Sequence, residues 1–277
     1  AIIVSFQGNI LPIVIAKVTF SKIIIRCNTA PSKYINNILK KFFFKSFYSL
    51  SNIILVTSID FKKEFYKYFK LNSIVHRQSL DIKEIKRKSK NKVNFNFFKN
   101  FNGLKIINVG RLTHQKNQII LLKAFAKLVK IRSARLLLVG SGSDKENLVN
   151  FINQKKINDK VKIIPFTPNP FKYISLSDIK VLSSRYEGNP NILLEIASLK
   201  KFIISSNCKV GPREILQSGK GGILYKVGDY NRLYLILKKI DLKSKYIKSK
   251  IENTYKYVHN NFQKDISNPF IDIIKKL

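Results

Sequence analysis

Methionine is absent from the 277-residue sequence, only 16 acidic residues face 52 Lys and Arg, and there are just two cysteines. Cys27 and Cys208 lie far apart without a CxxC pattern or a nearby His, which excludes a local zinc motif and is typical of a reducing compartment. No apolar run reaches the ~20 residues that a membrane helix needs, and residues 1–20 have no signal-peptide pattern. These absences favour a cytoplasmic protein without a spanning segment.

The net charge of +36 is compatible with nucleic-acid binding, but Lys far outnumbers Arg. Arg is the residue that reads phosphates and bases in a fixed geometry, and no recognition motif accompanies the charge. We therefore expect no specific nucleic-acid partner, and a general nucleic-acid binder stays a competing hypothesis that predicts steeply salt-dependent binding. Attraction to an anionic membrane surface is another consequence that such a charge implies.

Short β-rich runs alternate with amphipathic helical windows, which predicts parallel α/β sheets. Strands are expected at residues 2–6, 22–26, 53–57, 73–76, 105–109, 135–139, 161–164, 179–182 and 202–205. Helices are expected at residues 11–19, 34–49, 61–69, 115–130, 144–154 and 191–198.

A Lys- and Asn-rich stretch at residues 82–103 predicts a basic linker that closes a first domain, 1–103. A second domain, 104–240, and a helical tail, 241–277, follow. The first domain has few strands, and together with the missing methionine this predicts that its first elements lie outside the sequence.

The first candidate site follows the strand expected at 105–109. Gly110 lets backbone approach a ligand, and the start of the next helix offers free N–H groups to an anion. Arg111 and Lys116 add two cations, so the pattern predicts a diphosphate site. An ordinary strand–helix turn with solvated cations remains the alternative.

The second candidate site follows the strand expected at 179–182. Glu187 precedes a helix whose first turn suits Pro190, and Glu195 lies within that helix. Carboxylates accept paired hydroxyl donors, so these two predict contacts with sugar and ribose diols. A solvent-facing Glu195 is the alternative, although its neighbours in the helix are apolar.

These residues carry a family resemblance. GRL-x-x-QKN from Gly110, SRYEGxPNxLLEIAS from Ser184 and GPREIL from Gly211 resemble glycosyltransferase family 4 and its retaining GT-B relatives. The resemblance is dense over residues 104–235. It implies a GT-B fold, in which two Rossmann-like domains flank a donor cleft, here with a truncated N-terminal domain.

The resemblance also implies roles for single residues. Arg111 and Lys116 would hold the donor diphosphate beside Gly110, Glu187 the transferred sugar, and Glu195 the nucleotide ribose. Glu187, Arg111 and Lys116 would thus be the catalytic residues. The remaining contacts implied, with phosphate at the helix start and with the base, are Gly188, Asn189, Pro190, Asn191, Ile192 and Phe166.

The implied activity is retaining transfer of a hexosyl or N-acetylhexosaminyl group from a UDP- or GDP-sugar in surface polysaccharide or glycoconjugate synthesis. The acceptor would be a glycan or polyprenyl-linked sugar, bound by the first domain, where Arg26-Cys27-Asn28 occupy the place of a His in many relatives. No Asp-x-Asp occurs, so no metal or other cofactor is expected.

Two further alternatives for the function stay open, and so does the role of residues 40–47. A sugar-nucleotide epimerase would need cleft carboxylates with a His, and an inactive relic would bind nucleotide sugar or a partner without turnover. Residues 40–47 mix Lys with Phe, which fits either peripheral docking on the inner face of the cell membrane or a core helix with Lys at its rim.

Overall fold

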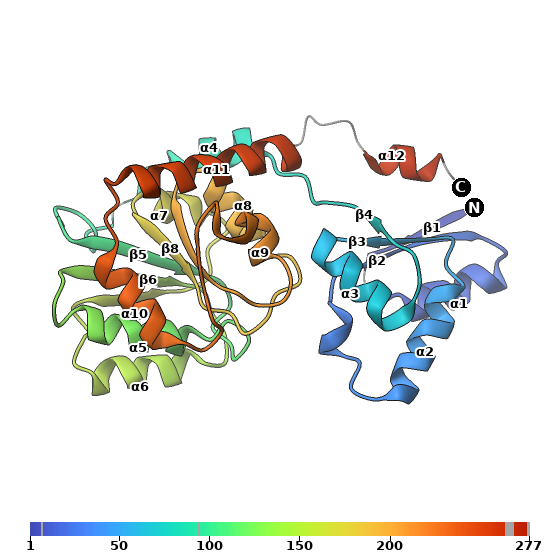
Figure 1. Cartoon of the computed structure of the whole chain (residues 1–277), viewed down its shortest axis with the longest axis horizontal. Coiled ribbons are helices and arrows are strands. Elements are labelled where there is room, and N and C mark those ends of the chain that lie inside the picture. The colour runs from blue at the N-terminus through green and yellow to red at the C-terminus, as the bar shows by residue number, and fades with distance from the viewer. Residues whose placement is uncertain (7, 94, 264–268, 276–277) are drawn as a thin grey trace. The chain divides into compact units, whose positions relative to one another are not determined.

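The computed structural model describes residues 1–6, 8–93, 95–263 and 269–275. The chain divides into two units, one made of Ala1–Ser79 with Lys264–Leu277 and the other of Leu80–Gln263 (Figure 1). Each unit combines parallel strands with helices, so the predicted α/β class is confirmed for both.

In the first unit the described residues form a four-stranded parallel sheet in the order β1-β2-β3-β4. The strands are β1 (Ile2–Ser5), β2 (Lys22–Cys27), β3 (Ile53–Val56) and β4 (Ile74–Val75). The helices are α1 (Ile10–Val18), the 3₁₀ helix η1 (Pro31–Lys33), α2 (Ile38–Ser49), α3 (Ile59–Phe69) and α12 (Pro269–Ile274).

Helix α3 shows how the sequence builds this unit. Phe61, Phe65 and Phe69 recur every four residues, which places them on one helix face, and all three are fully buried. Ser58 caps the helix by accepting a hydrogen bond from the Phe61 N–H at 3.1 Å. The buried aromatic stripe therefore fixes α3 against the rest of the unit.

Helix α2 begins at Ile38, four residues after its predicted start. Pro31–Lys33, just before the predicted helix, form the 3₁₀ helix η1, and Asn37 has an extended backbone that cannot belong to a helix. The Asn37 side chain caps α2 by accepting from the Lys40 N–H at 2.8 Å. The sequence pattern did not predict that a cap at Asn37 separates η1 from α2.

In the second unit the described residues form a six-stranded parallel sheet in the order β10-β9-β8-β5-β6-β7. The strands are β5 (Leu104–Val109), β6 (Ala134–Val139), β7 (Val161–Ile164), β8 (Ile179–Leu182), β9 (Phe202–Ser206) and β10 (Ile223–Tyr225). The helices are α4 (Ile82–Ser89), α5 (Gln118–Leu128), α6 (Lys145–Gln154), α7 (Phe171–Ser175), α8 (Asn191–Ser198), α9 (Pro212–Ile215), η2 (Gln217–Gly219), α10 (Tyr230–Lys239) and α11 (Lys245–Phe262).

Two hydrophobic cores lie on the two faces of this sheet. Because side chains alternate along a strand, Ile106 packs in one core with Phe125 of α5, while Ile107 packs in the other with Leu193 of α8. Figure 1 shows α5 and α10 on one side of the sheet and α8 and α11 on the other. Strands β7 and β8 and helix α8 have the bounds that the sequence predicts.

The Lys-rich stretch at 82–103 contains α4 and packs on the second unit. Ile82 and Ile85 are buried together with Phe98 in the core under α8, while the lysines of α4 lie toward solvent. In the structure the division between the units therefore falls between Ser79 and Leu80.

Candidate active site

The second sheet reverses its strand order between β5 and β8. From β5 the chain runs outward through β6 and β7 and then returns to β8, which pairs with β5 on the opposite side. Parallel sheets bind ligands outside the carboxyl ends of their strands at such a reversal. The two predicted motifs occupy the loops that follow β5 and β8, so the fold brings them to the same edge of the sheet.

Close backbone packing shapes the loop after β5. Gly110 has a φ of 155°, and its N–H donates to the Val139 carbonyl at 3.0 Å. A Cβ on Gly140 would lie 2.0 Å from the Gly110 carbonyl oxygen, so only glycine at 140 allows this approach. Gln118 Nε2 donates to the Arg111 carbonyl at 2.9 Å. The loop is thus held in one conformation before any ligand binds.

Helix α5 begins later than the predicted residue 115. Asn117 has a φ of 53°, a left-handed conformation that interrupts the helix, so α5 starts at Gln118. Lys116 consequently stays in the loop, where its side chain points to the β8 motif and pairs with Glu187.

The loops after β5 and β8 are joined by backbone and side-chain hydrogen bonds. The Arg185 N–H donates to the Gln115 carbonyl at 2.8 Å, and Gln115 Nε2 donates to the Tyr186 carbonyl at 3.1 Å. Ser183 Oγ donates to the Lys116 carbonyl at 2.9 Å. These contacts fix the two motifs relative to each other.

An ion pair lies at the centre of the site. Lys116 Nζ is 2.7 Å from Glu187 Oε1 and 2.9 Å from Oε2, and Ser184 Oγ donates to Oε1 at 2.5 Å. The Glu187 side chain is only 5% exposed and that of Lys116 17%. A buried pair with good geometry holds both side chains in place, so an incoming polar ligand meets fixed charges.

Lys180, in the middle of β8, is a site residue that the sequence reasoning missed. Its side chain is fully buried, and Nζ donates to the Val109 carbonyl at 3.2 Å. Burial lowers the pKa of Lys180 well below its usual range, as does Lys116, while Glu187 and Glu195 oppose the shift. The available signal was a lysine inside an apolar run of a parallel strand, a position that is normally Val, Ile or Leu.

Glu195 lies on α8, one turn beyond the helix start, and is partly buried. Burial raises the pKa of Glu195, and Lys180 acts in the opposite direction. Lys180 therefore couples electrostatically to both predicted carboxylates. The start of α8 is fixed by Gly211, whose Cβ position lies 2.3 Å from Pro190 Cδ and leaves no room for a side chain.

The other predicted residues lie around this centre. Arg111 is exposed, and its guanidinium donates to Gln115 Oε1 at 3.5 Å. Phe166, in the loop after β7, is also exposed, and its N–H donates to Ser141 Oγ at 3.2 Å. Gly188, Asn189 and Ile192 flank the start of α8, where Asn189 Nδ2 donates to Asn191 Oδ1 at 2.9 Å. Their ligand contacts stay predictions.

Replacing Lys180 with methionine is expected to keep or raise the free energy of unfolding, within about 1–2 kcal/mol, because an apolar side chain of similar size removes a buried charge. The pKa of Glu195 should rise further, since Lys180 no longer opposes its shift. Urea unfolding measures the first effect, and titration of the Glu195 carboxyl followed by NMR measures the second. Lys201→Met is the matched control, because Lys201 bonds the Ser175 and Ser177 carbonyls instead. An unchanged pKa of Glu195 in Lys180→Met would contradict this coupling.

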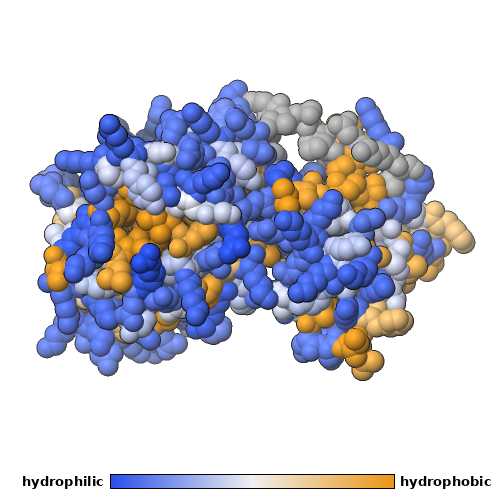
Figure 2. Space-filling view, viewed as in Figure 1, coloured by the Kyte–Doolittle hydropathy of each residue, from blue (hydrophilic) through white to orange (hydrophobic). Residues whose placement is uncertain are grey.

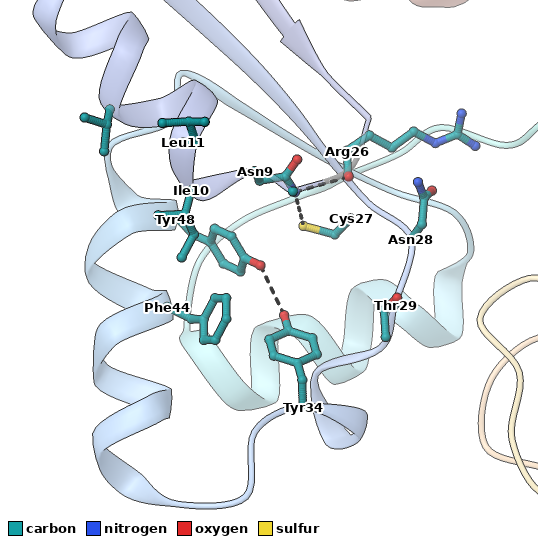
Figure 3. A pocket seen from close by; sticks show the side chains of 12 residues that line it. Asn9, Ile10, Leu11, Arg26, Cys27, Asn28, Thr29, Tyr34, Phe44 and Tyr48 are labelled. Carbon is teal, nitrogen blue, oxygen red and sulfur yellow. Dashed lines mark hydrogen bonds between the residues drawn. The ribbon is translucent and has the colours of Figure 1, made fainter.

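The first unit contains a cavity of about 700 Å³ at the carboxyl end of β2. Arg26, Cys27 and Asn28 line one side, and Tyr34 and Tyr48 line another, with their hydroxyl oxygens 3.3 Å apart (Figure 3). Burial raises the pKa of the Cys27 thiol to about 12, which disfavours the thiolate form. The structure thus places the residues expected near the acceptor on a cavity wall.

Within the described residues, no group of three or more His, Cys, Asp or Glu side chains is arranged to hold a metal ion. No helix in the described part of the chain is long and apolar enough to cross a membrane.

The chain belongs to the family of glycosyl transferases group 1, whose profile matches residues 89–257. It is 34% identical over 180 residues to an uncharacterized glycosyltransferase of Methanocaldococcus jannaschii, a match that covers 62% of this chain and 44% of that protein. It is 30% identical over 133 residues to a Campylobacter jejuni N-acetylgalactosaminyltransferase that acts on a diphospho-undecaprenol-linked sugar. This match covers 48% of this chain and 36% of that protein. The matches thus span less than half the length of these relatives.

Solved structures share the fold. The Anabaena protein HepE in complex with UDP superimposes with a TM-score of 0.83 at 15% identity, covering 99% of this chain and 79% of that one. A glycosyltransferase from Rickettsia africae superimposes with a TM-score of 0.82 at 19% identity, covering 99% of this chain and 76% of that one. The two parallel-sheet units therefore have the GT-B fold, and the predictions of family and fold class are confirmed.

Proposed function

We propose that the chain transfers a hexosyl or N-acetylhexosaminyl group, with retention, from a UDP- or GDP-sugar to a glycan or polyprenyl-linked acceptor. The observation that carries this proposal is the buried Lys116–Glu187 pair at the strand-order reversal, with Glu195 on the helix that follows Glu187. The HepE complexes with UDP and with UDP-glucose support a nucleotide-sugar donor.

In this proposal Arg111 and Lys116 bind the donor diphosphate, with Gly110 allowing its close approach to the backbone and the start of α8 supplying backbone N–H groups. The bond between the sugar C1 and the β-phosphate oxygen breaks, and the charge left on the diphosphate is stabilised by these fixed cations. The acceptor oxygen attacks C1 from the same face, and its proton passes to the departing phosphate. Glu187 orients the sugar hydroxyls, while Glu195 accepts from the ribose diol. No step requires a metal ion.

On the acceptor side, we propose that the cavity at the end of β2 receives the acceptor. Arg26 and Asn28 offer polar contacts, and Tyr34, Phe44 and Tyr48 offer aromatic faces to a sugar ring or lipid. The lipid-linked substrate named for the Campylobacter jejuni relative and the basic composition support work at the inner face of the cell membrane, in polysaccharide or glycoconjugate synthesis.

The direct test measures release of nucleoside diphosphate from UDP- and GDP-sugars with and without polyprenyl-diphosphate-linked sugars. We expect release that depends on both the donor and an acceptor, with the anomeric configuration of the donor kept in the product. Saturable donor binding with no acceleration by any acceptor in the panel would instead identify a nucleotide-sugar-binding protein without turnover.

A further inference from the structure

Helix α2 carries an apolar face that the fold leaves uncovered. Ile38, Leu39 and Phe42 are 75%, 79% and 72% exposed, and Phe43 is about half exposed. They fall on one side of the helix, since residues three and four apart lie one above the other. Figure 2 shows hydrophobic surface over the α2 end of the first unit. Single exposed apolar residues are common, but a contiguous group of four large ones marks an interaction surface.

The opposite side of α2 is what anchors the helix. Tyr48 is buried, with its ring centroid 5.7 Å from that of Phe65 and 5.4 Å from that of Phe69, both on α3. The Asn37 cap completes the first turn, which holds Ile38 and Leu39 in helical geometry. The exposed face is thus a fixed surface whose side chains the core does not need.

The charges around this face have one sign. The sequence contains no Asp or Glu before Asp60, whereas Lys40, Lys41 and Lys45 belong to α2 itself. On the helix, Lys40 and Lys41 lie to either side of the apolar group. A partner must therefore accept apolar side chains and offer negative charge around them.

We propose that this face of α2 docks on an anionic lipid bilayer, with Ile38, Leu39 and Phe42 inserted among the lipid acyl chains and the lysines of α2 at the lipid phosphates. An amphipathic helix with a basic polar flank binds the bilayer interface in this way, and lysine stems extend along apolar surface to place their charge at the phosphates. The inference names the surface for the membrane association proposed above, and it does not require the donor site to be functional.

The chain has no tryptophan, so Phe42→Trp introduces a single fluorescent reporter. With vesicles of phosphatidylglycerol and phosphatidylcholine, we expect a blue shift of its emission and quenching by lipids brominated on the acyl chains. Pure phosphatidylcholine vesicles should give at least roughly tenfold weaker binding, since the cations contribute only with anionic lipid. Ile131→Trp is the matched control, because Ile131 is exposed on the second unit and should show neither change.

A variant with Ile38→Ser, Leu39→Ser and Phe42→Ser should bind anionic vesicles at least roughly tenfold more weakly in flotation assays, because apolar burial is removed. Its remaining binding should be fully reversed by salt. The control Ile131→Ser with Leu235→Ser alters exposed apolar residues of the second unit and should bind like the unmodified chain. Far-ultraviolet circular dichroism of each variant reports folding, and UDP titration reports the donor site separately.

Two results would overturn the inference. One is equal vesicle binding by the triple-serine variant and the unmodified chain. The other is a dimer of the unmodified chain that becomes a monomer in the triple-serine variant, which would assign the face to a second copy of the chain.

Discussion

Replacing Lys116 with alanine is expected to lower the rate of nucleoside diphosphate release by about 100- to 1000-fold, the cost typical of losing one fixed donor to a developing negative charge. Lys116 Nζ lies 2.7 Å from Glu187 Oε1, where the loops after β5 and β8 meet. In the proposed function Lys116 binds the donor diphosphate. Steady-state release from the matching nucleotide sugar measures the effect. Lys130→Ala, at an exposed lysine of the same unit, should leave the rate unchanged.

The same substitution should also destabilise the fold, because it leaves the buried Glu187 carboxylate without its cation. Breaking a buried pair from one side costs about 3–5 kcal/mol. The double variant Lys116→Met with Glu187→Gln removes both charges and should recover most of the free energy of unfolding without recovering the rate. Recovery of the rate in this double variant would contradict a direct role for Lys116 in transfer.

Replacing Glu195 with glutamine is expected to weaken UDP binding by about 10- to 100-fold, the value of a hydrogen bond to a charged acceptor. Glutamine keeps the size of the side chain, so packing on α8 should be preserved. Calorimetric titration measures the loss, and Glu252→Gln is the control, since Glu252 lies on α11 and pairs with Lys200 away from the site. An unchanged affinity would remove Glu195 from the nucleotide site.

Glu195→Gln should also change how stability depends on pH. Burial raises the folded-state pKa of Glu195 above its value in the unfolded chain. A carboxyl group whose pKa is higher in the folded state than in the unfolded state contributes stability that is fully present below its unfolded-state pKa. This stability is lost as pH rises through its folded-state pKa, because the buried carboxyl group must then ionise. The variant should therefore gain stability over the unmodified chain at neutral pH and lose this advantage on acidification. Urea unfolding at several pH values tests the sign.

Much of the second unit was predictable, because its strands are short apolar runs that end at Gly110 or at the Ser183-Ser184 pair. Sequence patterns also gave the two motifs and the anion-binding character of the first. The ion pair between Lys116 and Glu187 was not predictable from them, because it depends on strand order. Only the reversal between β5 and β8 places residues 71 positions apart within hydrogen-bond distance.

The sequence misled where composition hides packing. Lysine density made residues 82–103 resemble a solvated linker, yet Ile82 and Ile85 are spaced one helical turn apart and bury beside Phe98. In the first unit, the Lys- and Phe-rich composition of residues 40–47 left both a core helix and membrane docking open, and the structure buries Tyr48 of α2 while Ile38, Leu39 and Phe42 face solvent. In both cases the faces of a helix, rather than its average composition, decide what it contacts.

The most direct test of the account is calorimetric titration of the chain with UDP and with GDP, in parallel with the Lys116→Ala and Glu195→Gln variants. The expected result is saturable binding of one of these nucleotides, much weakened by both substitutions, since Lys116 is proposed to bind its diphosphate and Glu195 its ribose. No binding of either nucleotide by a folded chain, or binding indifferent to both substitutions, would contradict a donor site at the reversal between β5 and β8.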